Sequence, residues 1–242
     1  MRRVLILGGT AEARALAAEL AVRGVHVVSS LAGRVSNPRL PVGEVREGGF
    51  GGPDGLAAWL AAERIDTVVD ATHPFAARMT ASAAQASART GVPLLVLRRP
   101  GWREGPGDAW QRVASLYEAA AWLPSPARVF LTTGRRSLPV FTGLPGVWLL
   151  ARSVDPPEPP VPDDVHVLLD RGPYTVEGER SLIREHRLDV LVTKDSGGRM
   201  TTAKLVAARE LGLLVIMVDR PPLPTGVRRV ETVEEAAAWA QG

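Results

Sequence analysis

Short runs of consecutive apolar residues alternate with apolar-periodic stretches along the whole chain. The first run, Val4 to Leu7, is followed by a glycine turn and then by a helical pattern from Ala15 to Leu20. Runs that are apolar at every position are typical of strands buried on both faces of a parallel sheet. Their alternation with amphipathic stretches predicts an α/β protein with helices on both faces of its sheets. Trp59, Trp122 and Trp239 fall in predicted helices, and we expect them in the core.

An internal repeat predicts the domain organisation. Arg78-Met79-Thr80 recurs 121 residues later as Arg199-Met200-Thr201, and the same offset superimposes two later strands. We therefore predict two tandem Rossmann-like halves, a domain at 1–124 and a second at 125–242, facing each other across a cleft. The final helix of each half can cross to pack on the other, so the repeat unit and the compact domain need not coincide.

The turn after the first strand is a candidate phosphate site. Gly8-Gly9 lets the backbone approach a ligand closely, and the following helix offers unpaired N–H groups near Thr10 and Glu12. The turn departs from the Gly-x-Gly-x-x-Gly pattern of dinucleotide sites. After the second strand the chain carries Ser30 and Arg34 and no acidic residue. A hydroxyl and an arginine suit a 2′-phosphate, which favours NADPH over NADH, while an ordinary polar loop is the alternative.

The loop after the strand at 67–69 carries a second group of candidates. Pro74 is suited to the start of a helix, with Thr72 or His73 near its cap position. A loop at the carboxyl end of a strand is also where a nicotinamide would be flanked, so Thr72 and Phe75 are candidates for cofactor contact. His73 is a candidate proton donor, and a hydrogen-bonded scaffold role is its alternative.

The corresponding loops of the second half carry more positive charge. The candidates for contact with an anionic substrate are Arg135, Arg136, Arg171, Tyr174, Lys194, Ser196, Gly197 and Lys204. Ser196 begins a Ser-Gly-Gly segment that can form an anion-binding nest of backbone N–H groups. Lys204 could instead be a surface charge, and Tyr174 could pack beneath a turn. Asp195 is either a salt-bridge partner or a proton source, and the residues leave both open.

Composition narrows the class of function. The chain of 242 residues has no cysteine, which excludes disulfides and thiolate metal sites, and no histidine pair has metal-ligand spacing. No apolar segment approaches the ~20 residues of a membrane helix, so we expect a soluble, cytoplasmic protein. Only two of the 29 basic residues are lysines, and no basic run has interleaved aromatics. The net charge of +3 therefore fits an arginine-lined site for a polycarboxylate or phosphate better than it fits nucleic-acid binding.

Four segments carry a resemblance to a known family. They are Ile6 to Ala13, Asp70 to Ala76, Thr133-Gly134-Arg135 and Thr193 to Gly198. Through them the chain resembles the precorrin-6A reductases of cobalamin biosynthesis, over nearly its whole length. The resemblance implies that NADPH delivers a hydride to C19 of the C18=C19 double bond of precorrin-6A, which gives precorrin-6B. It also implies a large tetrapyrrole substrate that bears many carboxylates.

The resemblance leaves alternatives open. Cobalt-precorrin-6A reductases of the anaerobic pathway perform the same chemistry on a metallated ring, and no residue separates the two possibilities. A non-catalytic two-lobed binder of nucleotides or anionic metabolites is an alternative from another class, and a nucleic-acid-binding protein is a third. Since the cofactor carries the hydride, water could replace His73 or Asp195 as the proton source. No pattern predicts the oligomeric state.

Overall fold

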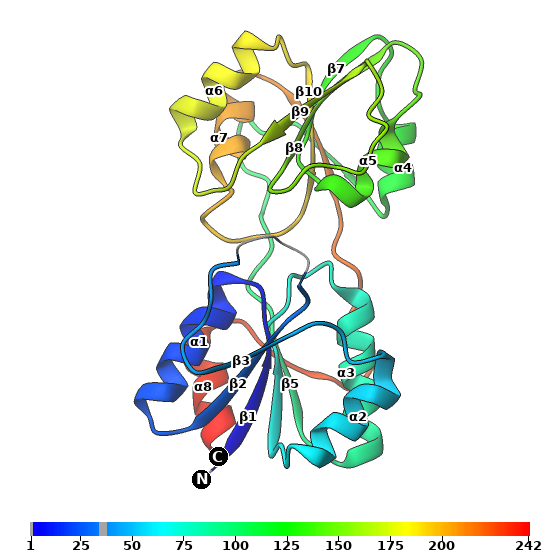
Figure 1. The fold of residues 1–242 in the computed structure, drawn as a ribbon. Coiled ribbons are helices and arrows are strands. Elements are labelled where there is room, and N and C mark those ends of the chain that lie inside the picture. Colours follow the sequence, from blue (N-terminus) through cyan, green and yellow to red (C-terminus); the bar gives the residue numbers. More distant parts are fainter. Residues whose placement is uncertain (1, 34–37) are drawn as a thin grey trace. The chain divides into compact units, whose positions relative to one another are not determined.

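The computed structural model describes residues 2–33 and 38–242 and divides into two compact units. The first unit comprises Met1–Pro100 and Pro221–Gly242, and the second comprises Gly101–Arg220. Each unit contains one six-stranded sheet with helices packed against it (Figure 1). The predicted fold class, two α/β halves with parallel sheets, is confirmed.

The sheet of the first unit is parallel throughout, with the strand order β12-β5-β4-β1-β2-β3. Its strands are β1 (Arg3–Leu7), β2 (His26–Leu31), β3 (Glu44–Glu47), β4 (Thr67–Asp70), β5 (Leu94–Leu97) and β12 (Arg228–Val230). The order of connection reverses between β1 and β4. In sheets of this kind, ligands bind beyond the carboxyl ends of the strands at such a reversal.

Two pairs of helices cover the sheet of the first unit. The helices are α1 (Ala11–Val22), α2 (Gly52–Ala62), α3 (Ala77–Thr90) and α8 (Val233–Gln241). Figure 1 shows α1 and α8 on one face and α2 and α3 on the other. Val4 and Ile6 belong to the core on the α1 face, whereas Leu5 and Leu7 belong to the core on the α2 face. The apolar run of β1 is therefore buried on both faces, as its pattern predicts.

The sheet of the second unit repeats this topology, in the order β6-β11-β10-β7-β8-β9 with all strands parallel. Its strands are β6 (Trp110–Val113), β7 (Ala127–Leu131), β8 (Val147–Ser153), β9 (Val165–Leu169), β10 (Val190–Lys194) and β11 (Leu214–Val218). The reversal now lies between β7 and β10. The matching strand order supports the internal repeat.

The helices of the second unit are shorter on average than those of the first. They are α4 (Leu116–Ala121), the 3-10 helix η1 (Arg135–Ser137), α5 (Leu138–Phe141), α6 (Val176–Glu185) and α7 (Ala203–Glu210). Helices α6 and α7 pack together on one face, over a core that includes Phe130 and Leu150, and α4 and α5 lie on the other face (Figure 1). In the described ranges of both units, no helix is long and apolar enough to cross a membrane.

The compact units differ from the repeat units 1–124 and 125–242, because each repeat gives its last strand and helix to the other unit. β6 and α4 end the first repeat but belong to the second unit, where β6 pairs with β11. β12 and α8 end the second repeat but belong to the first unit, where β12 pairs with β5 and α8 packs against α1. The cleft predicted between the halves stays a prediction.

One expected core residue lies at the surface. Trp122, directly after α4, is 52% exposed, whereas Trp59 and Trp239 pack against the two cores of the first unit. Helix α4 has only six residues and buries Ala119 alone. The helix ends at Ala121 and Trp122 is its C-cap, so the tryptophan does not lie on the buried face of a continuing helix, and the prediction for Trp122 was wrong.

Candidate functional site

The turn after β1 leaves room for a ligand to approach the backbone. Gly9 has a φ of 109°, which strongly favours glycine, and a Cβ at this position would meet nothing within 4 Å. The Thr10 hydroxyl caps α1 by accepting a hydrogen bond from the Ala13 N–H (3.1 Å), and it donates one to the Ala71 carbonyl (2.7 Å). The turn therefore places the start of α1 at the switch point between β1 and β4, in a geometry that suits a phosphate.

An arginine that was not predicted lies beside Ser30. Arg46 in β3 donates hydrogen bonds to the Ser30 hydroxyl (3.0 Å) and the Gly48 carbonyl (2.9 Å), and its guanidinium lies 3.8 Å from the ring centroid of Phe50. Burial lowers the pKa of Arg46. The predicted Arg34 lies outside the described residues. Because β3 is polar and was not recognised as a strand, Arg46 was missed, although it ends up next to a predicted cofactor residue.

Positive charge gathers around the start of α1. Glu12, a predicted cofactor residue, forms an ion pair with Arg99, with Oε2 and the guanidinium nitrogen 2.7 Å apart. Burial and the charge of Arg39 both lower the pKa of Arg14, against the smaller effect of Glu12. Two arginines, Arg14 and Arg99, therefore interact with the Glu12 carboxylate, which is already bonded to Arg99. Arg14 could have been identified from the sequence, since it lies in the first turn after the Gly-Gly segment.

Asp70 organises the loop that comes after β4. Its buried carboxylate accepts hydrogen bonds from the Thr72 N–H (3.0 Å), the Thr72 hydroxyl (2.7 Å) and the Thr80 hydroxyl (2.6 Å). The Thr72 side chain is therefore used within the loop. Its predicted contact with a cofactor would have to compete with the Asp70 carboxylate.

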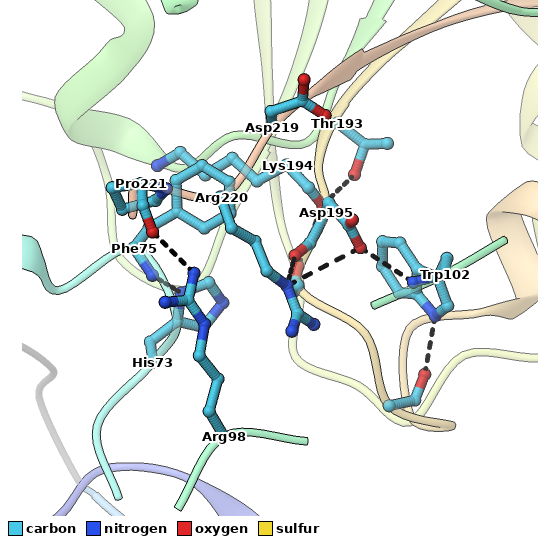
Figure 2. A network of polar contacts seen from close by, with 12 residues as sticks. His73, Phe75, Arg98, Trp102, Thr193, Lys194, Asp195, Asp219, Arg220 and Pro221 are labelled. Carbon is cyan, nitrogen blue, oxygen red and sulfur yellow. Dashed lines mark hydrogen bonds and ion pairs between the residues drawn. The ribbon is translucent and has the colours of Figure 1, made fainter. Parts of the chain in front are cut away.

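His73 and Phe75 lie next to each other in the same loop (Figure 2). The His73 ring nitrogen Nδ1 accepts a hydrogen bond from the Phe75 N–H (3.2 Å), and the two ring centroids are 5.8 Å apart. Helix α3 begins at Ala77 and not at Pro74, because the Ala76 N–H closes a turn on the His73 carbonyl (2.8 Å). His73 is exposed at the carboxyl end of the sheet, the edge where a reacting group is expected.

The matching turn of the second unit is built around a cation. Gly134 has a φ of 90° and is followed by η1 and α5 instead of one long helix. The Lys194 ammonium donates a hydrogen bond to the Thr133 carbonyl (2.8 Å), and burial lowers the pKa of Lys194. A small pocket opens at this turn and is lined by residues that include Arg135, Arg152 and Ser153. The switch point of the second unit thus offers positive charge where the first offers a glycine pair.

Asp195 connects three segments of the second unit. Its carboxylate, only 4% exposed as a residue, accepts hydrogen bonds from the Trp102 N–H (2.9 Å) and the Arg112 guanidinium (2.8 Å). Its backbone carbonyl accepts one from Arg220 (2.7 Å), and Figure 2 shows Asp195 between Trp102 and Arg220. A Cβ at Gly101 would lie 2.8 Å from the carboxylate. These contacts favour the salt-bridge alternative for Asp195 over a proton source.

Lys204 belongs to a buried charged cluster. It is the second residue of α7 and is 4% exposed, so the surface alternative is wrong. Burial and, to a lesser extent, the charge of Arg152 lower the pKa of Lys204, and Glu179 acts in the opposite direction, so that the resulting pKa is about 7. Arg152 from β8 binds both carboxylate oxygens of Glu179 from α6, at 2.5 and 3.0 Å. The Tyr174 ring stacks on Arg152, with the guanidinium carbon 3.6 Å from its centroid.

Arg152 and Glu179 were not predicted from the sequence. Arg152 gives a usable signal, because it is a charged residue at the end of an apolar strand.

The remaining candidates are dispersed over the same loops. The Ser196 hydroxyl donates to the Lys194 carbonyl (3.1 Å), Gly197 is buried with a φ of 63°, and Arg136 and Arg171 are exposed. Within the described ranges, no three histidine, aspartate or glutamate side chains gather as metal ligands would.

The fold and these loops define a class: doubly wound α/β proteins of two units, with candidate ligand sites at the carboxyl ends of the strands. The family model described as "Precorrin-6x reductase CbiJ/CobK" matches residues 3–241. The chain belongs to this family, and the predicted family and oxidoreductase class are confirmed.

Individual relatives bear names that are consistent with this family. The chain is similar to a precorrin-6A reductase of Rhodococcus erythropolis, at 56% identity over 99% of this chain and 97% of the relative. It is also similar to a cobalt-precorrin-6A reductase of Priestia megaterium, at 30% identity over 92% of each chain. A solved structure described as "CobK precorrin-6A reductase" superimposes with a TM-score of 0.94 at 45% identity, covering 100% of this chain and 96% of the other.

Proposed function

We propose that the chain reduces the C18=C19 double bond of precorrin-6A with NADPH, with hydride delivered to C19, and so forms precorrin-6B. The observation that supports this most strongly is the full-length similarity to the Rhodococcus precorrin-6A reductase at 56% identity. The cobalt-precorrin-6A reductase of Priestia megaterium is only 30% identical in sequence. The difference favours the metal-free ring as substrate. The cytoplasmic location stays a prediction.

The first unit is the proposed site for the cofactor, which supplies the hydride when bound. Gly8-Gly9 and the start of α1 suit the pyrophosphate, because the turn has room for close approach and α1 is capped by Thr10. Ser30, with Arg34 and the newly found Arg46, would bind the 2′-phosphate. Phe75 would flank the nicotinamide. A nicotinamide cofactor is what a reductase of this family requires, and NADPH specifically is our proposal.

The second unit is the proposed site for the substrate carboxylates. Arg135, Arg136, Arg171, Lys194 and Lys204 supply the positive charge, and Tyr174, Ser196 and Gly197 complete the set. Guanidinium groups bind carboxylates through paired hydrogen bonds, which suits a ring with many acetate and propionate groups. For the proton at C18 we propose His73 or water, since the Asp195 carboxylate is held by Trp102 and Arg112.

A spectroscopic assay tests the proposed reaction. The protein is mixed with NADPH, and precorrin-6A is then added while absorbance at the nicotinamide wavelength is followed. We expect absorbance to fall only after the second addition, and to fall more slowly with cobalt-precorrin-6A. Binding of NADPH without its oxidation would instead indicate a non-catalytic binder.

Cofactor preference tests the assignment of Arg34. The variant Arg34→Ala should raise KM for NADPH and barely change KM for NADH, because only NADPH carries the 2′-phosphate. Arg23→Ala is the control, since Arg23 lies at the other end of α1 in an ion pair with Glu19. An equal loss with both cofactors would contradict the assignment.

A further inference from the structure

A short loop that is rich in glycine follows β10 in the second unit and carries two of the proposed substrate residues, Ser196 and Gly197. Gly197 and Gly198 have φ values of 63° and 80°, a region that glycine occupies without strain. Glycine also loses more conformational freedom on folding than any other residue. Contacts from outside the loop must therefore hold it in one conformation if its backbone is to bind a ligand.

Trp102 supplies two of these contacts from a distant part of the sequence. Its backbone N–H donates a hydrogen bond to the Asp195 carboxylate (2.9 Å), and its indole N–H donates one to the Gly198 carbonyl (3.1 Å). Figure 2 shows Trp102 next to Asp195. One residue therefore holds both ends of the loop, and Ser196 and Gly197 lie between these ends.

Other donors act at one end each. The Arg112 guanidinium donates to the second oxygen of the Asp195 carboxylate (2.8 Å). The Thr202 hydroxyl donates to the Gly198 carbonyl (2.6 Å). Arg112 thus supports the first end of the loop and Thr202 the second, whereas Trp102 acts at both.

The position of Trp102 is fixed by packing. Its ring packs against the core of the second unit, and the Lys204 ammonium lies 5.4 Å from the ring centroid. Gly101 permits the close approach of the backbone, because a Cβ there would lie 2.8 Å from the Asp195 carboxylate. The repeat offset of 121 residues places Leu223 at the matching position of the first unit, and leucine has no side-chain N–H. The indole contact is therefore particular to the second unit.

We propose that Trp102 is a positioning residue for the loop from Asp195 to Gly198: its backbone N–H fixes the first end and its indole N–H fixes the second. Ser196 and Gly197 are thereby held in the conformation that binds a carboxylate. This last step rests on the proposed function, in which these two residues contact the substrate. The fixing of the loop does not depend on which substrate binds, so the two steps can be tested separately.

The order of the loop can be measured without a ligand. Trp102→Phe removes the indole N–H but keeps an aromatic ring and the backbone N–H. We expect the NMR order parameters of Gly197 and Gly198 to fall from about 0.85, typical of rigid backbone, towards about 0.6. The matched control is Trp148→Phe, the same substitution against the same core near the amino end of β8, which should leave both values unchanged.

A second variant acts on the other end of the loop. Gly101→Ala leaves Trp102 and Asp195 unchanged but adds a Cβ 2.8 Å from the carboxylate, so the hydrogen bond from the Trp102 N–H must lengthen. The order parameter of Gly197 should fall here too. Gly105→Ala is the control, since a Cβ at that position would meet nothing closer than 3.6 Å.

Lower order in both test variants, with both controls unchanged, supports the proposal. Unchanged order in either test variant overturns it. If Trp102→Phe does not fold, the result for Gly101→Ala decides.

Kinetics then test the link to the reaction. Trp102→Phe should raise KM for precorrin-6A about threefold to tenfold, which corresponds to the net contribution of about one hydrogen bond. The values of kcat and of KM for NADPH should stay nearly unchanged, because the loop affects substrate binding and not the chemical step. A less ordered loop with an unchanged KM for precorrin-6A would support the positioning role and overturn the substrate role of Ser196 and Gly197. If the unaltered chain does not oxidise NADPH with precorrin-6A, the proposed function fails, and the order parameters still decide the positioning role.

Discussion

The two units have the same parallel sheet but differ in the segment that comes directly after the strand at the switch point. In the first unit, β1 leads through a glycine pair into α1, a helix of 12 residues capped by the Thr10 side chain. In the second unit, β7 leads into η1 and a four-residue α5, and η1 has no side-chain cap. A long capped helix suits a phosphate, whereas an interrupted one beside Lys194 suits a carboxylate.

The polar groups beneath the loops differ as well. In the first unit, the Asp70 carboxylate accepts hydrogen bonds from the hydroxyls of Thr72 and Thr80, so a single charge is surrounded by uncharged donors. In the second, Arg152, Glu179 and Lys204 bring three ionisable groups into the core. The two units therefore share one sheet topology, but the first has an open turn at its switch point and the second has charged side chains in its core. The comparison suggests that the units divide cofactor and substrate between them.

The largest expected effect concerns the buried cluster. Glu179→Leu should lower the free energy of unfolding by about 3–5 kcal/mol, because Arg152 and Lys204 lose their buried counter-charge. Urea denaturation would measure it. Glu177→Leu, at the exposed position of the same helix, should change stability by about 0.5 kcal/mol or less. Similar losses in both variants would contradict the special role of the cluster.

The pH dependence of stability should also distinguish the units. The pKa of Lys204 is lowered to about 7 in the folded chain, and in the unfolded chain it lies near its usual value, ~10.4. Between these values the unfolded chain binds more protons, so the free energy of unfolding rises with pH, by up to about 1.4 kcal/mol per unit. Lys204→Met should flatten this slope in urea denaturation. An unchanged slope would show that Lys204 is charged alike in both states.

Two glycine variants test which unit holds the cofactor. Gly9→Ala and Gly134→Ala are matched, since both positions have positive φ and a Cβ at either would meet nothing within 4 Å. Each should cost about 1–2 kcal/mol of stability. Only Gly9→Ala should also raise KM for NADPH, measured by initial rates at saturating precorrin-6A. A rise confined to Gly134→Ala would place the cofactor at the pocket of the second unit.

The smallest expected effect concerns the cap of α1. Thr10→Ala should cost about 1 kcal/mol in thermal or urea denaturation, because the Ala13 N–H loses its acceptor. Thr10→Ser should restore most of it. Ser115→Ala, which removes the cap of α4 in the second unit, should cost a similar amount without affecting KM for NADPH. A KM effect of Thr10→Ala beyond that of Ser115→Ala would sharpen the difference between the units.

The candidate site could be predicted only in part. Residues at or directly after the carboxyl ends of apolar strands, such as Gly8-Gly9, Ser30 and Lys194, were identified, because parallel strands place these ends at one edge of the sheet. Arg46 was missed because β3, Glu44–Glu47, has no apolar pattern. Glu179 was missed because a single glutamate in an amphipathic helix looks like a surface residue, and only the packing of α6 shows that it is buried.

The fold class, the duplication and the family could be predicted without a structure, since they depend on local apolar periodicity and on motifs that can be read along the chain. The tertiary structure decided which segments belong to which unit, because β6 and β12 pair across long sequence distances that no local pattern encodes. It also decided the state of single polar residues. Lys204 could have been a surface charge, and its burial beside Arg152 and Glu179 depends on three elements that meet only in the folded chain.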